Sequence, residues 1–153
     1  MPVVHNSTLL NSKCSSVKEL YEIHQLNPMN NGVNTIDTVL SIDVPKQSLC
    51  MGNLTSIRYE GQRPVCLLNI KDVGVFTIPL NAQLLVSEDG IWGSVQDRRL
   101  IPGGKVGIYN HDTIEFHSIV NITHLPENYI SYTLKVANRH NYVLDNGLIV
   151  HED

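Results

Sequence analysis

The alternation of apolar and polar residues near the end of the chain predicts two short strands around a turn. From Tyr132 to Val136 every second residue is apolar, which is the pattern of a strand with one buried face. Further apolar runs occupy positions 142–144 and 148–150. The Asn146-Gly147 pair between these runs favours a turn that needs positive φ.

The same pattern predicts short strands along most of the chain, and only one segment has helical spacing. In that segment Leu20, Ile23 and Leu26 would share one face of a helix, which Pro28 would end. Turns are expected at 60–64 and around Pro126. The remaining strands are expected at 38–43, 54–59, 65–70, 73–78, 83–86 and 114–120. Many short strands joined by closely spaced turns predict an all-β domain, with helix confined to the region 17–26.

Length and composition narrow the class of protein further. The chain has 153 residues, 42% of them hydrophobic, enough for one domain with a substantial core. The net charge of −4 argues against nucleic acid as a general partner. The sequence has neither an apolar run of membrane-spanning length nor an evident secretory signal. We therefore expect a protein of the cytoplasm or of a virion, not secreted and without a membrane partner.

The first thirteen residues are small and polar and have no periodic pattern. Such a segment cannot order itself alone, so its apolar residues Val3, Val4, Leu9 and Leu10 must pack on something. Either the chain's own domain or a neighbouring subunit would serve. We predict an arm at 1–13 that contacts another protein subunit by adding a strand to that partner's sheet edge, followed by a domain at 14–153.

Three stretches resemble the motifs of Hint domains, the fold shared by inteins and hedgehog autoprocessing domains. The C-terminal stretch carries Tyr132-Thr-Leu-Lys-Val136, His140-Asn-Tyr142 and Gly147-Leu-Ile-Val-His151. The second stretch runs from 79 to 106, and the third is the strand at 38–43. The resemblance covers about residues 14–151. It implies a flattened horseshoe of short strands with pseudo-two-fold symmetry.

The resemblance also implies which residues would carry autoprocessing. In this family a cysteine or serine attacks the preceding carbonyl group, and a Thr-x-x-His pair polarises that peptide and protonates the leaving amine. A late aspartate assists, a penultimate histidine activates the last step, and a terminal asparagine cyclises. On this chain the catalytic candidates are Cys14 as nucleophile, with His140 and His151. The alternative is that Cys14 is a small buried residue and that both histidines merely end strands.

Four positions depart from the pattern that this chemistry needs. Pro79 stands at the threonine and Ala82 at the histidine, so neither the hydroxyl group nor the general acid is present. Thr133 stands at the aspartate, and Glu152, which lacks an amide nitrogen, stands at the asparagine. These losses predict a catalytically degenerate Hint domain.

We expect that domain to act as a structural or protein-interaction component of a larger assembly, such as a viral particle. One alternative is an autoprocessing cysteine domain that performs an N-to-S acyl shift at Cys14. Another is a splicing element whose histidine and asparagine were replaced to stop its reaction. Whether the chain is an enzyme is thus open, and the four losses favour that it is not.

Two further observations concern ligands and thiols. His111, His117 and His124 recur with Asp112 and Glu115 among them, but no CxxC or HxxxH spacing accompanies them. We therefore expect no metal and no cofactor. The cysteines, Cys14, Cys50 and Cys66, are expected to be free thiols in a reducing compartment.

Overall fold

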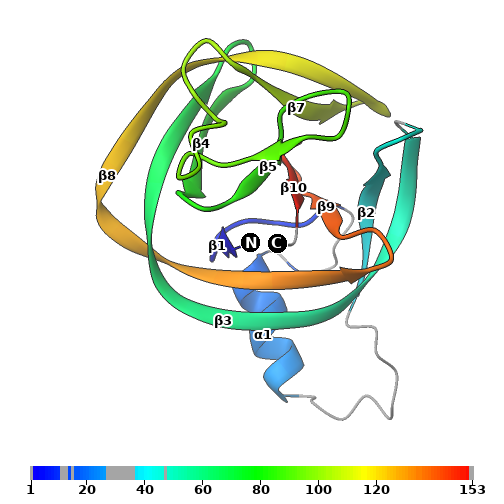
Figure 1. Cartoon of the computed structure of the whole chain (residues 1–153). Coiled ribbons are helices and arrows are strands. Elements are labelled where there is room, and N and C mark those ends of the chain that lie inside the picture. The colour runs from blue at the N-terminus through cyan, green and yellow to red at the C-terminus, as the bar shows by residue number, and fades with distance from the viewer. Residues whose placement is uncertain (1, 11–13, 15, 27–36, 47, 152–153) are drawn as a thin grey trace.

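Two long curved strands enclose the short central strands of this protein, and one helix packs outside them (Figure 1). The computed structural model describes residues 2–10, 14, 16–26, 37–46 and 48–151. Glu152 lies outside the described residues, as does part of the predicted arm. The elements are β1 (Pro2–Val4), α1 (Val17–Leu26), β2 (Asp37–Asp43), β3 (Ser48–Ile70), β4 (Gly74–Pro79), β5 (Gln83–Leu85), β6 (Trp92–Gly93), β7 (Lys105–Asn110), β8 (Thr113–Ala137), β9 (Asn141–Val143) and β10 (Ile149–His151).

The long strands β3 and β8 pair with each other antiparallel, from Asn53 opposite Ala137 to Ile70 opposite Ile119. Turns were predicted at 60–64 and around Pro126, and both predictions are wrong because each strand continues through the segment. The β3–β8 register shifts between Tyr59 and Gly61 and again between Pro64 and Cys66. Such β-bulges bend a strand and accommodate proline without losing a ladder bond.

The two long strands repeat one arrangement, which confirms the predicted all-β, Hint-like horseshoe. A hairpin joins β2 to the first part of β3, and another joins β7 to the first part of β8. Correspondingly, β4 pairs with the last part of β3 and β1 with the last part of β8. A smaller antiparallel sheet, in the order β6-β5-β10-β9, fills the middle of the molecule.

The core forms where the alternating apolar residues of these strands face inward. Tyr132, Leu134 and Val136 are all buried, as their spacing predicts, whereas Lys135 is exposed. Burying such side chains contributes roughly 1.5–3 kcal/mol each. The turn before β10 also follows the prediction, with Gly147 at a φ of 94°.

Helix α1 has the predicted bounds but a different buried face. Ser16 caps the helix, accepting a hydrogen bond from the N–H of Glu19 at 3.1 Å. Val17 and Leu20 are buried, whereas Ile23, expected on the same face as Leu20, is 44% exposed. Tyr21 instead contacts the sheet: its ring centroid lies 5.0 Å from that of Tyr132. No helix in the described part of the chain is long and apolar enough to cross a membrane.

The N-terminal segment, predicted to be an arm, belongs over residues 2–10 to the domain itself. Val3 and Val4 are each 3% exposed, and β1 pairs with β8. Leu9 is buried and forms a β-bridge with Leu144. The physical reason is that these apolar side chains find a site in the domain's own core.

Candidate functional site

The strands nearest the two ends of the chain, β1 and β10, lie in the middle of the horseshoe (Figure 1). Both line a small apolar cavity. From β1 come Val3 and Val4, and from β10 comes Val150. Pro79 and Ala82, the positions that the resemblance assigns to the Thr-x-x-His pair, line the same cavity. The other lining residues are Ser7, Thr77, Ile78, Leu84, Leu144 and Leu148.

A tight turn between β4 and β5 fixes Pro79 and Ala82 against this cavity. The N–H of Ala82 donates to the C=O of Pro79 at 3.1 Å. Leu80 holds the turn in place, because its N–H donates to Pro64 at 3.2 Å and its C=O accepts from Gln96 at 2.9 Å. The backbone therefore presents positions 79 and 82 to β1, although neither side chain can exchange a proton.

The cavity itself leaves only ≈ 10 Å³ of free space, at the limit of what one water molecule needs. Its polar side chains are the hydroxyl groups of Ser7 and Thr77. The residues that stand where a nucleophile would face positions 79 and 82 are Val3 and Val4, which sequence reasoning did not assign to the site. The sequence signal that could have placed them there is a pair of adjacent valines in an otherwise polar segment.

Cys14, the predicted nucleophile, lies between Leu10 and the start of α1 in the sequence. The start of α1 is held to the N-terminal segment, since the N–H of Val17 donates to the C=O of Ser7 at 2.7 Å. The Cys14 side chain is half-buried and packs against the main core. It is not among the residues that line the cavity with Pro79 and Ala82.

One of the two candidate histidines, His151, lies on the central sheet, and the other, His140, lies just before β9. His151 on β10 pairs with Asn141 of β9, and His140 immediately precedes Asn141. His140 is exposed and adopts a φ of 62°. His151 is half-buried, with its ring centroid 4.8 Å from that of Trp92. Neither histidine lines the apolar cavity.

Trp92, which our sequence reasoning did not connect with His151, is positioned by the loop that follows β6. The guanidinium of Arg99 donates to the C=O of Trp92 at 3.0 Å. Asp97 orders the loop by accepting from the N–H groups of Ser94 and Arg99. Burial alone would raise the pKa of Asp97, but these hydrogen bonds and those from the side chains of Gln83 and Ser94 lower it.

Thr133, at the position of the assisting aspartate, belongs to a different cluster. It pairs with Arg58 across the β3–β8 ladder and forms a side-chain hydrogen bond with Glu60. Burial raises the pKa of Glu60, and bonds from Arg58, Thr133 and Arg63 more than offset that effect and lower it. Thr133 therefore supports a carboxylate that is ion-paired on the sheet.

The remaining thiols and the candidate metal residues form no second centre. Burial raises the pKa of the Cys66 thiol to about 11. Burial also raises that of Cys50, which lies near the Arg139–Asp43 ion pair. His117 contacts Glu115 at 3.0 Å, yet within the described ranges no three His, Cys, Asp or Glu side chains are grouped to hold a metal ion.

Solved structures of inteins share this architecture over the whole chain. The DnaB intein from Synechocystis sp. PCC 6803 matches with a TM-score of 0.75 at 20% identity, covering 100% of this chain and 99% of that one. The PabCDC21-1 intein matches with a TM-score of 0.77 at 16% identity, covering 99% and 98%. A KlbA intein precursor from Methanococcus jannaschii matches at 0.73 and 12% identity, covering 100% and 92%.

These likenesses define the class to which the fold belongs. The chain has a Hint fold of the intein type, as its three motifs predict. No protein-family profile matches the chain, and no curated protein matches it in sequence. At these identities the likeness concerns the fold, so the activity is argued from the site.

Proposed function

We propose that this protein is a Hint domain that does not process its own backbone and that serves as a protein-interaction or structural component of a larger assembly. One observation carries the proposal: Val3, Val4, Pro79, Ala82 and Val150 converge on a nearly filled apolar cavity. That is where the fold brings the two ends of the chain together.

The chemistry of an acyl shift explains why this observation matters. A nucleophile must reach the preceding carbonyl carbon, and a positioned acid must protonate the amine that leaves. Valine, proline and alanine side chains provide neither group. A proton donor must also lie within hydrogen-bond reach of the reacting peptide, whereas Cys14, His140 and His151 do not line the cavity.

The alternative function is autoprocessing at Cys14, and one observation favours it. Cys14 is half-buried, not enclosed, and His140 directly precedes Asn141, the residue of β9 that pairs with His151. In such a reaction the nucleophile, Cys14, would act outside the cavity that Pro79 and Ala82 line. The thiol would then need a proton acceptor other than the side chain at position 82.

Intact mass of a fusion protein tests the two functions directly. The chain would be placed between two stable reporter domains and incubated with dithiothreitol and, separately, with hydroxylamine. We expect one species of unchanged mass, because Ala82 supplies no acid for the leaving amine. The Cys14→Ala fusion serves as the matched control and is expected to behave identically.

A fragment that begins at Cys14, absent from the Cys14→Ala control, would reject the proposal and establish the autoprocessing function. Release of the downstream reporter alone would also reject it, because that reaction needs an active C-terminal end. Either product would be visible as a new mass with a defined terminus.

A further inference from the structure

The outer edge of β4 presents backbone groups that pair with no other strand in the described part of the chain. The N–H of Leu80 donates to the C=O of Pro64. This bond shows which residues of β4 direct their backbone groups toward β3. Because hydrogen-bonded positions alternate along an antiparallel pair, the N–H and C=O groups of Val75 and Thr77 point away from β3. Within the described residues, no backbone hydrogen bond reaches them from that side.

A groove runs along this free edge. Its first part, a pocket of ≈ 240 Å³, lies between Val75–Thr77 and a wall formed by residues 6–8 and Asp145-Asn146. The wall is braced, because the N–H of Asp145 donates to the C=O of Thr8 at 2.8 Å. Asn146 also lines a second pocket, of ≈ 230 Å³, that begins at Asp72-Val73 on the same hairpin. The two pockets thus share Asn146 and border the same β3–β4 hairpin.

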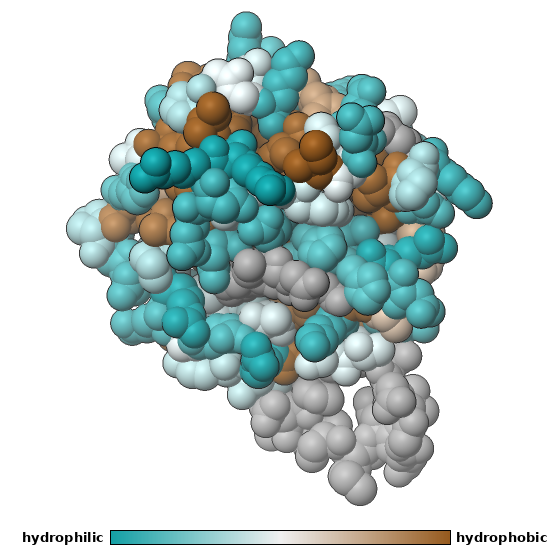
Figure 2. Space-filling view, viewed as in Figure 1, coloured by the Kyte–Doolittle hydropathy of each residue, from teal (hydrophilic) through white to brown (hydrophobic). Residues whose placement is uncertain are grey.

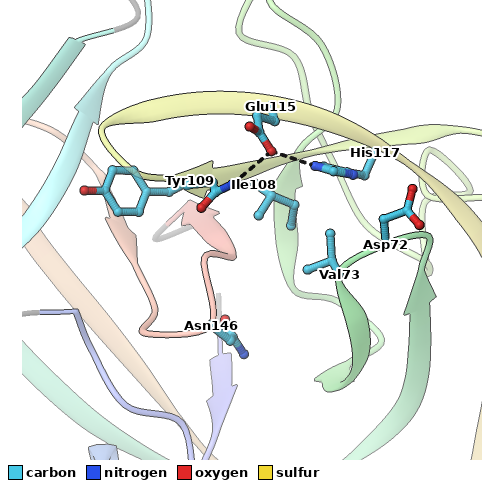
Figure 3. A pocket seen from close by; sticks show the side chains of 8 residues that line it. Asp72, Val73, Ile108, Tyr109, Glu115, His117 and Asn146 are labelled. Carbon is cyan, nitrogen blue, oxygen red and sulfur yellow. Dashed lines mark hydrogen bonds and ion pairs between the residues drawn. The ribbon is translucent and has the colours of Figure 1, made fainter.

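Acidic side chains occur along both parts of the groove. Asp145 lines the first pocket, and Asp72 and Glu115 line the second. In Figure 3 His117 lies between Glu115 and Asp72, and Asn146 lies apart from them near the turn before β10. Hydrogen bonds from His117 and Asn110 lower the pKa of Glu115. His117 is the titratable side chain in contact with it.

From this geometry we propose that the groove binds an extended, basic segment of a partner polypeptide, which adds a strand to the free edge of β4. Extended peptides recognise sheet edges through backbone hydrogen bonds and use alternate side chains for specificity. The three carboxylates favour Lys or Arg at those positions. The inference deepens the interaction role proposed above and rests on it for its biological meaning.

A single segment fits this edge better than a folded second copy. Residues 6–8 and 145–146 line the pocket opposite Val75–Thr77, so the edge is bounded on its outer side, which favours one extended segment over a second sheet. A stable interface between folded proteins usually buries about 800 Å² on each partner. On the face shown in Figure 2, hydrophobic residues instead form small patches separated by polar ones.

Fluorescence anisotropy with two labelled peptides tests the inference on the full chain. The probe is an eight-residue peptide of alternating lysine and valine, and its control replaces each lysine with glutamate. We expect the basic peptide to bind at least ~10-fold more tightly, with a difference that shrinks in about 1 M salt, where screening is strong. The Asp72→Asn/Asp145→Asn variant should reduce the difference in affinity between the two peptides. Asparagine is a suitable replacement at position 72 because it tolerates the φ of 64° there.

The strand-addition geometry has its own matched pair of variants. Thr77→Pro removes the outward N–H without touching a β3–β4 bond, and Thr77→Val keeps that N–H and the side-chain shape. We expect Thr77→Pro to weaken binding ~10-fold or more relative to Thr77→Val. If Thr77→Pro does not fold, a peptide N-methylated at alternate residues replaces it and should show the same loss.

Three outcomes would overturn the inference: equal binding of both peptides, equal binding by the two Thr77 variants, or a dimer in sedimentation that Thr77→Pro abolishes. The last would identify a second copy as the occupant. None of these outcomes depends on cleavage, which is read separately from intact mass. Loss of peptide binding therefore rejects the groove alone, and a cleaved fusion rejects the non-processing function alone.

Discussion

At the scale of single residues, one member of the His140-Asn141 pair in the C-terminal motif stabilises the fold. Asn141 is 2% exposed, and its side chain acts as an extra peptide group that joins β9 to β2. Its Oδ1 accepts from the N–H of Ile42 at 2.8 Å, and its Nδ2 donates to the C=O groups of Ile42 and Arg139 at 2.9 and 3.0 Å. Ser41 adds a bond to the Asn141 carbonyl at 2.8 Å.

We therefore expect Asn141→Ala to lower the free energy of unfolding by about 2–5 kcal/mol, since it leaves buried groups of Ile42 without partners. Urea denaturation measures the loss, and Asn128→Ala, at an exposed position of β8, is the control with an expected effect within about 0.5 kcal/mol. Equal stability of the two variants would show that β2 does not depend on this side chain.

Sequence reasoning recognised the Asn141 motif but not its task, because a motif gives residue types and not partners. Ile42 and Asn141 are separated by 99 positions, and nothing local to either residue indicates the other. Period-two alternation, in contrast, is a local signal, and it correctly predicted which face of the stretch 132–136 is buried.

At the scale of elements, the difference between prediction and structure lies in how the strands bend. Gly61, Pro64 and Pro126 indicated turns, yet they lie within or beside bulges of continuous strands. Glycine and proline serve both purposes, and only pairing along the whole of β3 and β8 decides between them. The resemblance predicted the horseshoe correctly because it depends on short sequence motifs and not on the path of the chain between them.

The N-terminal segment supplies the prediction at this scale. Leu9 is 2% exposed and bridges to Leu144, so Leu9→Ala should cost about 2–5 kcal/mol through lost burial and a residual cavity. Differential scanning calorimetry of the full chain should show a clear fall in Tm.

Ile23→Ala on the exposed side of α1 is the matched control and should change stability by less than about 1 kcal/mol. Deleting residues 1–13 should destabilise the chain more than Leu9→Ala does. An unchanged Tm after the deletion would support the arm that the sequence alone suggested.

At the scale of the whole molecule, the fold brings its ends together as an intein-type domain does, but the meeting point is packed like a core. The sequence indicated the missing groups at Pro79 and Ala82. It did not indicate that Val3 and Val4 would face them, because the motif-based alignment began at Cys14, and the contact between β1 and the turn at 79–82 is long-range. Under the proposed function, apolar packing occupies the place that catalytic groups would need.

This arrangement predicts that restoring one catalytic group will not restore the reaction. Ala82 is 2% exposed beside a cavity of ≈ 10 Å³, so the larger, polar side chain of Ala82→His would be overpacked and poorly hydrogen-bonded. We expect Ala82→His to lower the free energy of unfolding by about 1–3 kcal/mol and to leave the intact mass of the fusion unchanged.

A double-mutant cycle with Val3 tests whether the small size of the cavity causes the expected loss of stability in Ala82→His. Val3→Ala alone should destabilise the protein, but in the Ala82→His background it makes room for the ring, so the two changes should cost less together than their sum. Ala137→His, at a half-buried position outside the cavity, is the control and should be additive with Val3→Ala. If Ala82→His is as stable as the unmodified chain and its fusion releases a fragment, the cavity still accommodates a catalytic imidazole, and the interpretation of the site as packed core is wrong.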